Sequence, residues 1–126
     1  MSGLLSFHEL KLNTREPVYL QAAAFVKRQI LLGRVTSGER LPSRREISAQ
    51  LGINPNTVQK AFKLMEEEGY VRTNSTLGSE IHVDEEGLER IRAELTEGLV
   101  KDFVASAKEI QLPFQRVIQL ISEVWD

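Results

Sequence analysis

Apolar residues recur at helical spacing most clearly between residues 41 and 69 of the chain. After Ser43, the apolar residues Ile47 and Leu51 are four positions apart and therefore share one face of a helix. In the next segment, four apolar residues have the i, i+3, i+4, i+7 spacing of a core-facing stripe: Val58, Ala61, Phe62 and Met65. This pattern predicts two short helices that turn their apolar faces toward a common core.

Each of these two helices carries its own start signal. Ser43 and Glu46 are three positions apart, as in a capping box, where each side chain bonds the other residue's backbone N–H. Asn54 is a preferred N-cap residue, and Pro55 follows at the first helical position, where a missing N–H costs nothing. Between the helices, Gly52 can adopt the left-handed conformation that ends a helix. We therefore predict a helix-turn-helix whose second helix spans residues 54–69.

The polar side chains of the second helix lie opposite its apolar stripe and gather toward its N-terminus. They are Asn56, Thr57, Gln59, Lys60 and Lys63. Amides and hydroxyls in this position can reach base edges, and the lysines farther along can reach phosphates. In a DNA-binding helix-turn-helix, the second helix enters the major groove with its N-terminal residues. The same pattern also fits an ordinary helical hairpin in a bundle, with a solvated polar face.

The segments on either side of the pair bear on these two interpretations. A helix is predicted from Val18 to Leu32, ended by Gly33. Residues 70–73 and 79–83 are predicted as two short strands around a polar turn at 74–78, and such a hairpin is stable only against other elements. Three helices followed by a hairpin make a winged helix-turn-helix, so the order of elements favours DNA binding. Residues 1–15 are predicted to form an arm, either a short extended piece or a segment packed on the next helix.

The last part of the chain, residues 84–126, is predicted to form two further helices. One carries a long apolar stripe at steps of three or four: Leu88, Ile91, Leu95, Leu99, Phe103, Ala107 and Ile110. Pro113 opens the other, whose apolar residues are Phe114, Val117, Ile118, Ile121, Val124 and Trp125. Two helices cannot bury this much apolar surface against each other alone, so the cover is either a second subunit or the chain's own winged domain. The residues expected at a dimer interface are Leu95, Leu99, Phe103, Val117, Ile121 and Trp125.

Composition narrows the function classes. The net charge of −2 divides into +3 for residues 1–83 and −5 for residues 84–126, a split typical of a chain whose basic part meets a polyanion. There is no cysteine, so disulfides, thiol nucleophiles and cysteine-based zinc sites are excluded. We expect no catalytic residue, metal or cofactor, because no nucleophile–base pair, ligand cluster or glycine-rich phosphate loop is present, and His8 and His82 stand apart. Without a signal peptide or an apolar run long enough to span a membrane, the expected location is the cytoplasm.

Several spaced motifs resemble the GntR family of bacterial transcription regulators, and within it the short YtrA-like subfamily. The resemblance covers nearly everything from Pro17 onward. Its motifs are Pro17-x-Tyr19-x-Gln21, Leu41-Pro42-Ser43-x-Arg45-Glu46, Leu51-x-Ile53-Asn54-Pro55-Asn56-Thr57-Val58, and Glu66-x-Glu68-Gly69. The resemblance implies a mainly α protein with a small β-hairpin: an arm (1–15), a winged helix-turn-helix domain (16–83) and a two-helix dimerisation segment (84–126).

The resemblance also implies individual roles. Arg45 matches the arginine that contacts DNA from the start of the family's second helix, and Gly78 matches the second glycine of its wing turn. The wing departs from the family pattern because its tip, residues 74–78, contains no Lys or Arg, so we expect it to hold DNA weakly. Arg44 is interpreted either as a phosphate contact or as a solvated side chain, and Asn54 either as a cap or as a base contact. The full predicted DNA-binding set is Ser43, Arg44, Arg45, Asn54, Asn56, Thr57, Gln59, Lys60, Lys63 and Gly78.

The sequence thus predicts a homodimeric winged-helix regulator that binds a pseudo-palindromic double-stranded DNA operator. A repressor is favoured, and the resemblance implies neighbouring transporter genes as targets. A small-molecule effector could bind at the dimer interface, although no cluster of residues points to one. The alternative is a winged-helix protein–protein interaction module, with the acidic helical tail as its working surface and no specific DNA binding.

Overall fold

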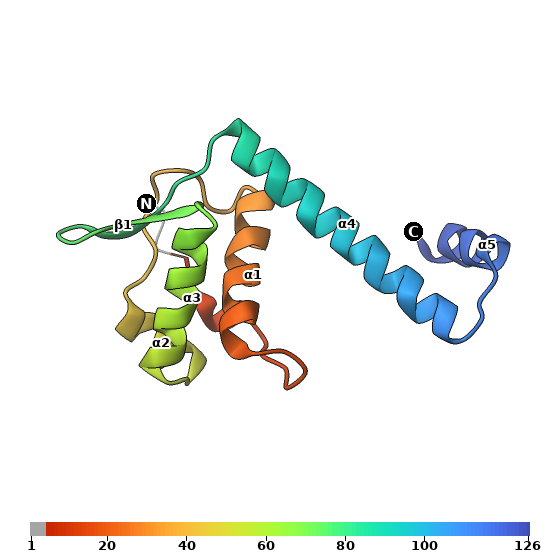
Figure 1. The fold of residues 1–126 in the computed structure, drawn as a ribbon, viewed down its shortest axis with the longest axis horizontal. Helices are drawn as coiled ribbons and strands as arrows, with labels where there is room; N and C mark the ends of the chain where they lie inside the picture. The colour runs from red at the N-terminus through yellow and green to blue at the C-terminus, as the bar shows by residue number, and fades with distance from the viewer. Residues whose placement is uncertain (1–4) are drawn as a thin grey trace. The chain divides into compact units, whose positions relative to one another are not determined.

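The computed structural model describes residues 5–126 and confirms the predicted fold class, a mainly α chain with a winged helix-turn-helix and two C-terminal helices (Figure 1). The elements are η1 (Phe7–Glu9), α1 (Val18–Leu31), α2 (Arg44–Leu51), α3 (Pro55–Glu67), β1 (Val71–Asn74), β2 (Gly78–Ile81), α4 (Glu85–Glu109) and α5 (Phe114–Val124). The chain divides into two compact units, and the boundary falls between Ile91 and Arg92, within α4.

The core of the N-terminal unit lies between α1 and α3, with α2 packed against α3 (Figure 1). The four apolar residues predicted to face inward from α3 are 1–2% exposed, and Ile47 of α2 is 2% exposed. An ion pair joins the C-terminal end of α3 to α1, because buried Lys27 places its Nζ 2.5 Å from Oε1 of the exposed Glu68. The hydroxyl of Tyr70 donates to the carbonyl oxygen of Ala23 at 3.2 Å, which also holds this end of α3 in place.

The predicted caps are present. Ser43 Oγ accepts from the backbone N–H of Glu46 at 3.1 Å, and Glu46 Oε1 accepts from the backbone N–H of Ser43 at 3.0 Å. The backbone N–H of Ser43 and its side chain together lower the pKa of Glu46 below its ordinary value of 4.5. Gly52 has a φ of 65°, the left-handed conformation expected at the end of α2. The turn of the helix-turn-helix is therefore determined by local chemistry.

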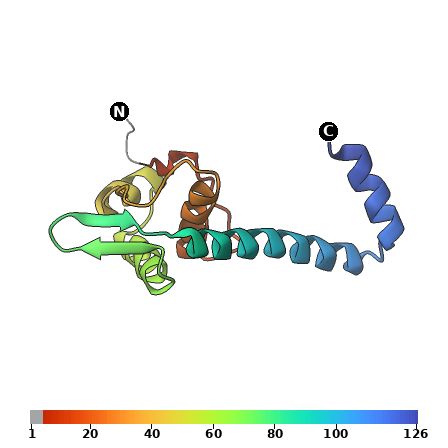
Figure 2. The same cartoon turned by 90° about the horizontal axis from the view of Figure 1, so that it is seen from above.

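The wing is a two-stranded antiparallel hairpin (Figure 2). Val71 pairs with Ile81 and Asn74 with Gly78, so both strands lie within one residue of the predicted starts. Residues 39–41 run beside β2: the N–H of Leu41 donates to Ser79 O at 2.9 Å, and that of Ile81 to Glu39 O at 2.8 Å. This third segment ties the wing to the approach of α2, a connection that the sequence pattern did not indicate.

Residues 5–15 of the N-terminal arm pack on the helices, one of the two predicted arrangements, and include the short helix η1, whereas residues 1–4 of the predicted arm lie outside the described residues. Phe7 is 1% exposed, and its ring centroid lies 5.1 Å from that of Phe25 in α1. Its backbone N–H donates to Gln50 Oε1 of α2 at 2.7 Å. Buried Gln21 fixes the following loop, since its amide accepts from Asn13 N at 2.9 Å and donates to Asn13 O at 2.9 Å.

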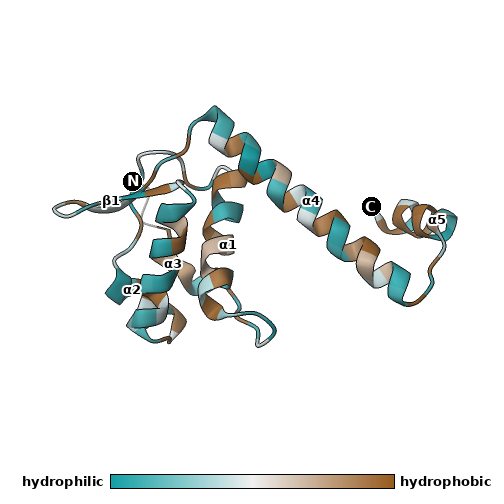
Figure 3. Cartoon of the chain, in the orientation of Figure 1, coloured by the Kyte–Doolittle hydropathy of each residue, from teal (hydrophilic) through white to brown (hydrophobic). Residues whose placement is uncertain are grey.

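The C-terminal unit contains the rest of α4 and α5, and it leaves most of its apolar side chains exposed. Leu99 is 74%, Phe114 76% and Trp125 81% exposed, whereas Ala107 is buried. Apolar and polar residues are interspersed along both helices of this unit (Figure 3). No helix within residues 5–126 has the length and apolar character needed to cross a membrane.

Candidate nucleic-acid interface

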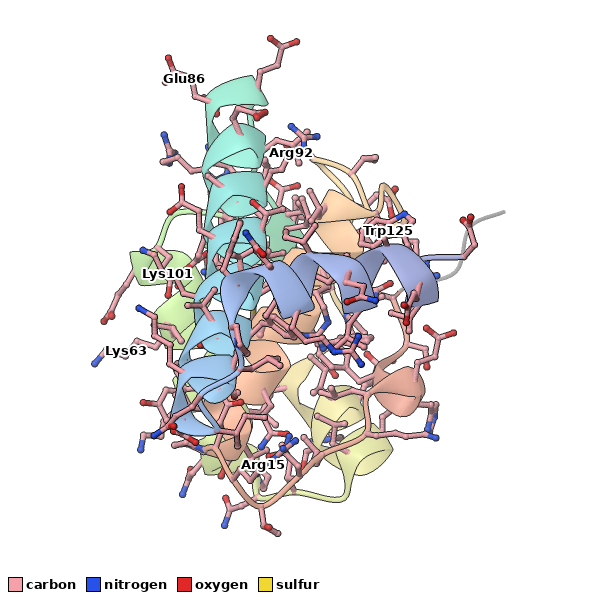
Figure 4. All side chains as sticks on the ribbon, turned by 90° about the vertical axis from the view of Figure 1, so that its right-hand side faces the viewer. Arg15, Lys63, Glu86, Arg92, Lys101 and Trp125 are labelled. Carbon is pink, nitrogen blue, oxygen red and sulfur yellow. The ribbon has the colours of Figure 1, made fainter. Side chains whose placement is uncertain are left out.

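The helix α3 presents two chemically different faces. Its apolar stripe is buried, and the side chains of Asn56, Gln59, Lys60 and Lys63 are exposed on the other side, with Thr57 half-buried. Figure 4 shows Lys63 projecting away from the helices of the N-terminal unit into solvent. These polar groups occupy the N-terminal two thirds of the helix, where a major-groove helix makes its base contacts. The structure thus places the predicted reading positions on one accessible surface.

The side chain of Asn54 caps the start of α3. Its Oδ1 accepts from the backbone N–H of Asn56 at 2.7 Å, the geometry of an N-cap, and Pro55 stands at the first helical position. Of the two interpretations of Asn54, the structure supports the cap. A separate contact with DNA stays a prediction.

Lys60 has a neighbour that was absent from the predicted site. Its Nζ lies 4.9 Å from the ring centroid of Tyr19, a half-buried residue in the first turn of α1. A cation over an aromatic face at this distance is attracted by about 0.5–1 kcal/mol at an exposed site. The aromatic ring therefore limits where the ammonium group can lie. The signal that could have suggested Tyr19 is its position in the Pro17-x-Tyr19-x-Gln21 motif.

The first turn of α2 supplies two exposed cations. The guanidinium carbon of Arg44 lies 5.0 Å from the ring centroid of Phe62, so this side chain is stacked on α3 and is not simply solvated. The Arg45 side chain is exposed and has no ion-pair or hydrogen-bond partner within residues 5–126. The hydroxyl and the backbone N–H of Ser43 are both hydrogen-bonded to Glu46 in the capping box. Two cations beside the positive end of a helix dipole are unfavourable for stability, which fits a role in binding an anion.

The wing has a well-defined turn, but its tip carries no charged side chain. Gly78 has a φ of 88°, which favours glycine at this corner of the turn. The tip is held by Asn74 Oδ1, which accepts from the backbone N–H groups of Thr76 at 2.8 Å and Leu77 at 3.1 Å. Behind the tip, Glu80 is paired across the strands with Arg72 at 2.9 Å, so its negative charge is offset.

A polar helix face, two cations at the start of α2 and a hairpin wing lie on one domain. This combination defines a winged helix-turn-helix DNA-binding protein, and within residues 5–126 no group of three His, Asp or Glu side chains could hold a metal. Residues 18–81 match the model of the bacterial regulatory proteins of the gntR family. The chain belongs to the GntR family of DNA-binding transcription regulators, and it is not an enzyme.

Two relatives from Bacillus subtilis extend this assignment. The HTH-type transcriptional regulator YhcF is 31% identical over 104 residues, which cover 82% of this chain and 86% of YhcF. The HTH-type transcriptional repressor YtrA is 42% identical over 57 residues, which cover 45% of this chain and 44% of YtrA. The predicted resemblance to the GntR family and to YtrA is thereby confirmed.

Solved structures share the fold. A GntR family transcriptional regulator from Listeria monocytogenes superposes with a TM-score of 0.80 at 23% identity, covering 90% of this chain and 99% of that chain. The AraR DNA-binding domain, solved in complex with its operator ORX1, has a TM-score of 0.50 at 23% identity and covers 64% of this chain and 90% of its own.

Proposed function

We propose that this protein is a homodimeric transcriptional repressor, a short YtrA-like member of its family, that binds a pseudo-palindromic operator through α3. The observation that carries the proposal is the α3 surface, where Asn56, Gln59 and Lys60 are exposed opposite a fully buried stripe. The amides of Asn56 and Gln59 can form bidentate bonds with base edges, and Arg45 would fix the register of the domain through a phosphate. Repression is supported by the similarity to the repressor YtrA.

We assign residues 16–83 to DNA binding and residues 84–126 to dimerisation. The side chains of Leu99, Phe103 and Trp125 are exposed on the C-terminal unit, and the exposure of large apolar side chains to water is unfavourable in free energy. We propose that a second copy of the chain covers these side chains. A dimer also suits an operator with two-fold symmetry, because the second copy supplies a second α3. The two half-sites would then be about 34–36 Å apart, or a multiple of that distance.

The target genes and the location follow from this assignment. Neighbouring transporter genes are the proposed targets, on the resemblance to YtrA-like regulators, and the cytoplasm is the proposed location because the operator is chromosomal DNA. A small-molecule effector bound at the dimer interface is compatible with the proposal, and no residue is assigned to it.

Operator binding is tested by fluorescence anisotropy. The probe is a labelled duplex selected from a randomised pool by the wild-type protein, with a scrambled duplex of equal composition as reference. We expect tight, salt-sensitive binding to the selected duplex, and the Arg45→Ala variant should lose about 1.5 kcal/mol or more, at least roughly tenfold in Kd. Arg34→Ala removes an exposed arginine from the loop after α1 and serves as the matched control. Equal binding of both duplexes, or none at low salt, would favour the interaction module instead.

Dimerisation is tested by sedimentation velocity. Leu99→Glu places a charge on the exposed apolar surface and should convert the dimer into a folded monomer, since a charge is costly to bury at an interface. Gln115→Glu, on an exposed position of α5, introduces the same charge and should leave the dimer intact. A wild-type monomer at high protein concentration would refute the dimer.

A further inference from the structure

A cleft separates the wing from the first turn of α2 within the N-terminal unit. It has a volume of about 470 Å³, and we call it the wing cleft. One wall carries Arg40, Ser43 and Arg44, and the other carries the wing residues Asn74 and Leu77. The segment 39–41, which leads into α2, is hydrogen-bonded to β2, and these bonds connect the two walls.

The wing cleft has an excess of positive charge. Arg44 lines it while stacked on Phe62, and Arg40 is exposed, with no side-chain hydrogen bond or ion pair to any residue from 5 to 126. The acids nearby are already engaged, because Glu46 accepts from the backbone N–H of Ser43 at 3.0 Å and Glu80 is paired with Arg72 at 2.9 Å. Two guanidinium groups are therefore available for an anion.

The position of Arg40 is fixed by the wing itself. Its backbone forms an antiparallel bridge with Glu80, and the residues on either side of it are hydrogen-bonded to β2. Leu41 is 5% exposed, and successive side chains of an extended segment point to opposite faces, so Arg40 points to the solvent side. Arg40 therefore places a positive charge on the segment next to the wing, whose own tip has no Lys or Arg.

We propose that the wing cleft holds one phosphate strand of the operator, and that Arg40 makes the phosphate contact that the uncharged wing tip cannot make. The proposal rests on the proposed function, since it requires α3 to lie in the major groove. The strand that borders this groove runs past the start of α2, where Arg44 and Arg45 also stand. An unpaired guanidinium binds phosphate strongly because it donates two parallel charge-assisted hydrogen bonds.

The test uses the selected duplex and titrations between about 50 and about 200 mM salt, where the slope of log K against log salt reports the number of phosphates that the protein neutralises. Arg40→Gln should weaken binding roughly tenfold at the low-salt end and reduce the slope by about 0.9 for each phosphate that is no longer neutralised. Arg40→Lys should keep the slope, because it keeps the charge. Arg34→Gln makes the same charge change on the loop after α1 and should leave both quantities unchanged.

Several outcomes would overturn the proposal. An unchanged slope in Arg40→Gln, with melting temperature preserved, would remove Arg40 from the phosphate contacts while leaving the DNA-binding function intact. An equal decrease of slope in Arg34→Gln would mean a general charge effect and no specific contact. Failure of the wild-type protein to bind any duplex would overturn this proposal and the proposed function together. Ethylation interference adds a direct readout, since Arg40→Gln should abolish the interference at one phosphate in each half-site.

Discussion

The clearest quantitative prediction concerns Asn54, the N-cap residue of α3. Its side chain satisfies the backbone N–H of Asn56 at 2.7 Å, one of the N–H groups that lack a partner within α3. Asn54→Ala removes this bond and should lower the free energy of unfolding by about 1 kcal/mol. For a chain of this size, that change corresponds to a decrease of about 4 °C in Tm.

A second substitution separates capping from base recognition. Serine is as good an N-cap as asparagine, so Asn54→Ser should preserve stability within a few tenths of a kcal/mol, yet it removes any amide contact with a base. An Asn54 that acts only as a cap predicts that Asn54→Ser binds the selected duplex as tightly as the wild-type protein. Urea unfolding and anisotropy on the same samples give both numbers, at one protein concentration because dimerisation affects the apparent stability.

Two results would change the role assigned to Asn54. If Asn54→Ser kept its Tm but bound DNA more than tenfold more weakly, the Asn54 side chain would contact a base in addition to capping α3. If Asn54→Ala were as stable as the wild-type protein, the bond would contribute nothing to α3.

Three further predictions concern neighbouring positions. Phe62→Ala empties a site that is 1% exposed and should cost about 3–5 kcal/mol in urea unfolding; a decrease below 1 kcal/mol would mean that the core refills. Tyr19→Leu should weaken DNA binding about two- to fivefold by releasing Lys60, whereas Tyr19→Phe keeps the ring and the affinity; equal weakening in both would implicate the hydroxyl instead. The lowered pKa of Glu46 means that the capping box stabilises fully above about pH 4.5 and less as pH falls toward the lowered pKa. Thermal melts should therefore show the advantage of wild type over Glu46→Gln shrinking near pH 4, and a constant difference would contradict this.

Contacts at both ends of α3 hold this helix on the domain, and with it the exposed face that is proposed to read DNA. The ion pair of Lys27 with Glu68 and the hydrogen bond of Tyr70 to Ala23 attach its C-terminal end to α1. At its other end, the cap and the cation–π contact of Lys60 limit the motion of the first turns. Side chains held on a packed helix lose less conformational entropy on binding than side chains of a mobile loop.

The sequence alone determined the helices of the winged domain, their starts and their inward faces. Capping boxes, N-caps and left-handed glycines act within four residues, so Ser43, Gly52 and Asn54 could be interpreted without any knowledge of the fold. The apolar stripe of α3 likewise depends only on helical periodicity, and for that reason its opposite face could be predicted as the DNA-reading surface.

Only the tertiary structure decided which distant residues meet. Phe7 binds Gln50, Tyr19 lies under Lys60, and the segment of Arg40 joins the wing, although each pair is separated by about forty residues in the chain. No local periodicity encodes such contacts, because they depend on how α1, α3 and the hairpin pack around a common core. The same packing left the Arg40 side chain without a hydrogen-bond or ion-pair partner among residues 5–126, beside a wing tip that has no charged residue. A cation therefore stands where the tip itself supplies none.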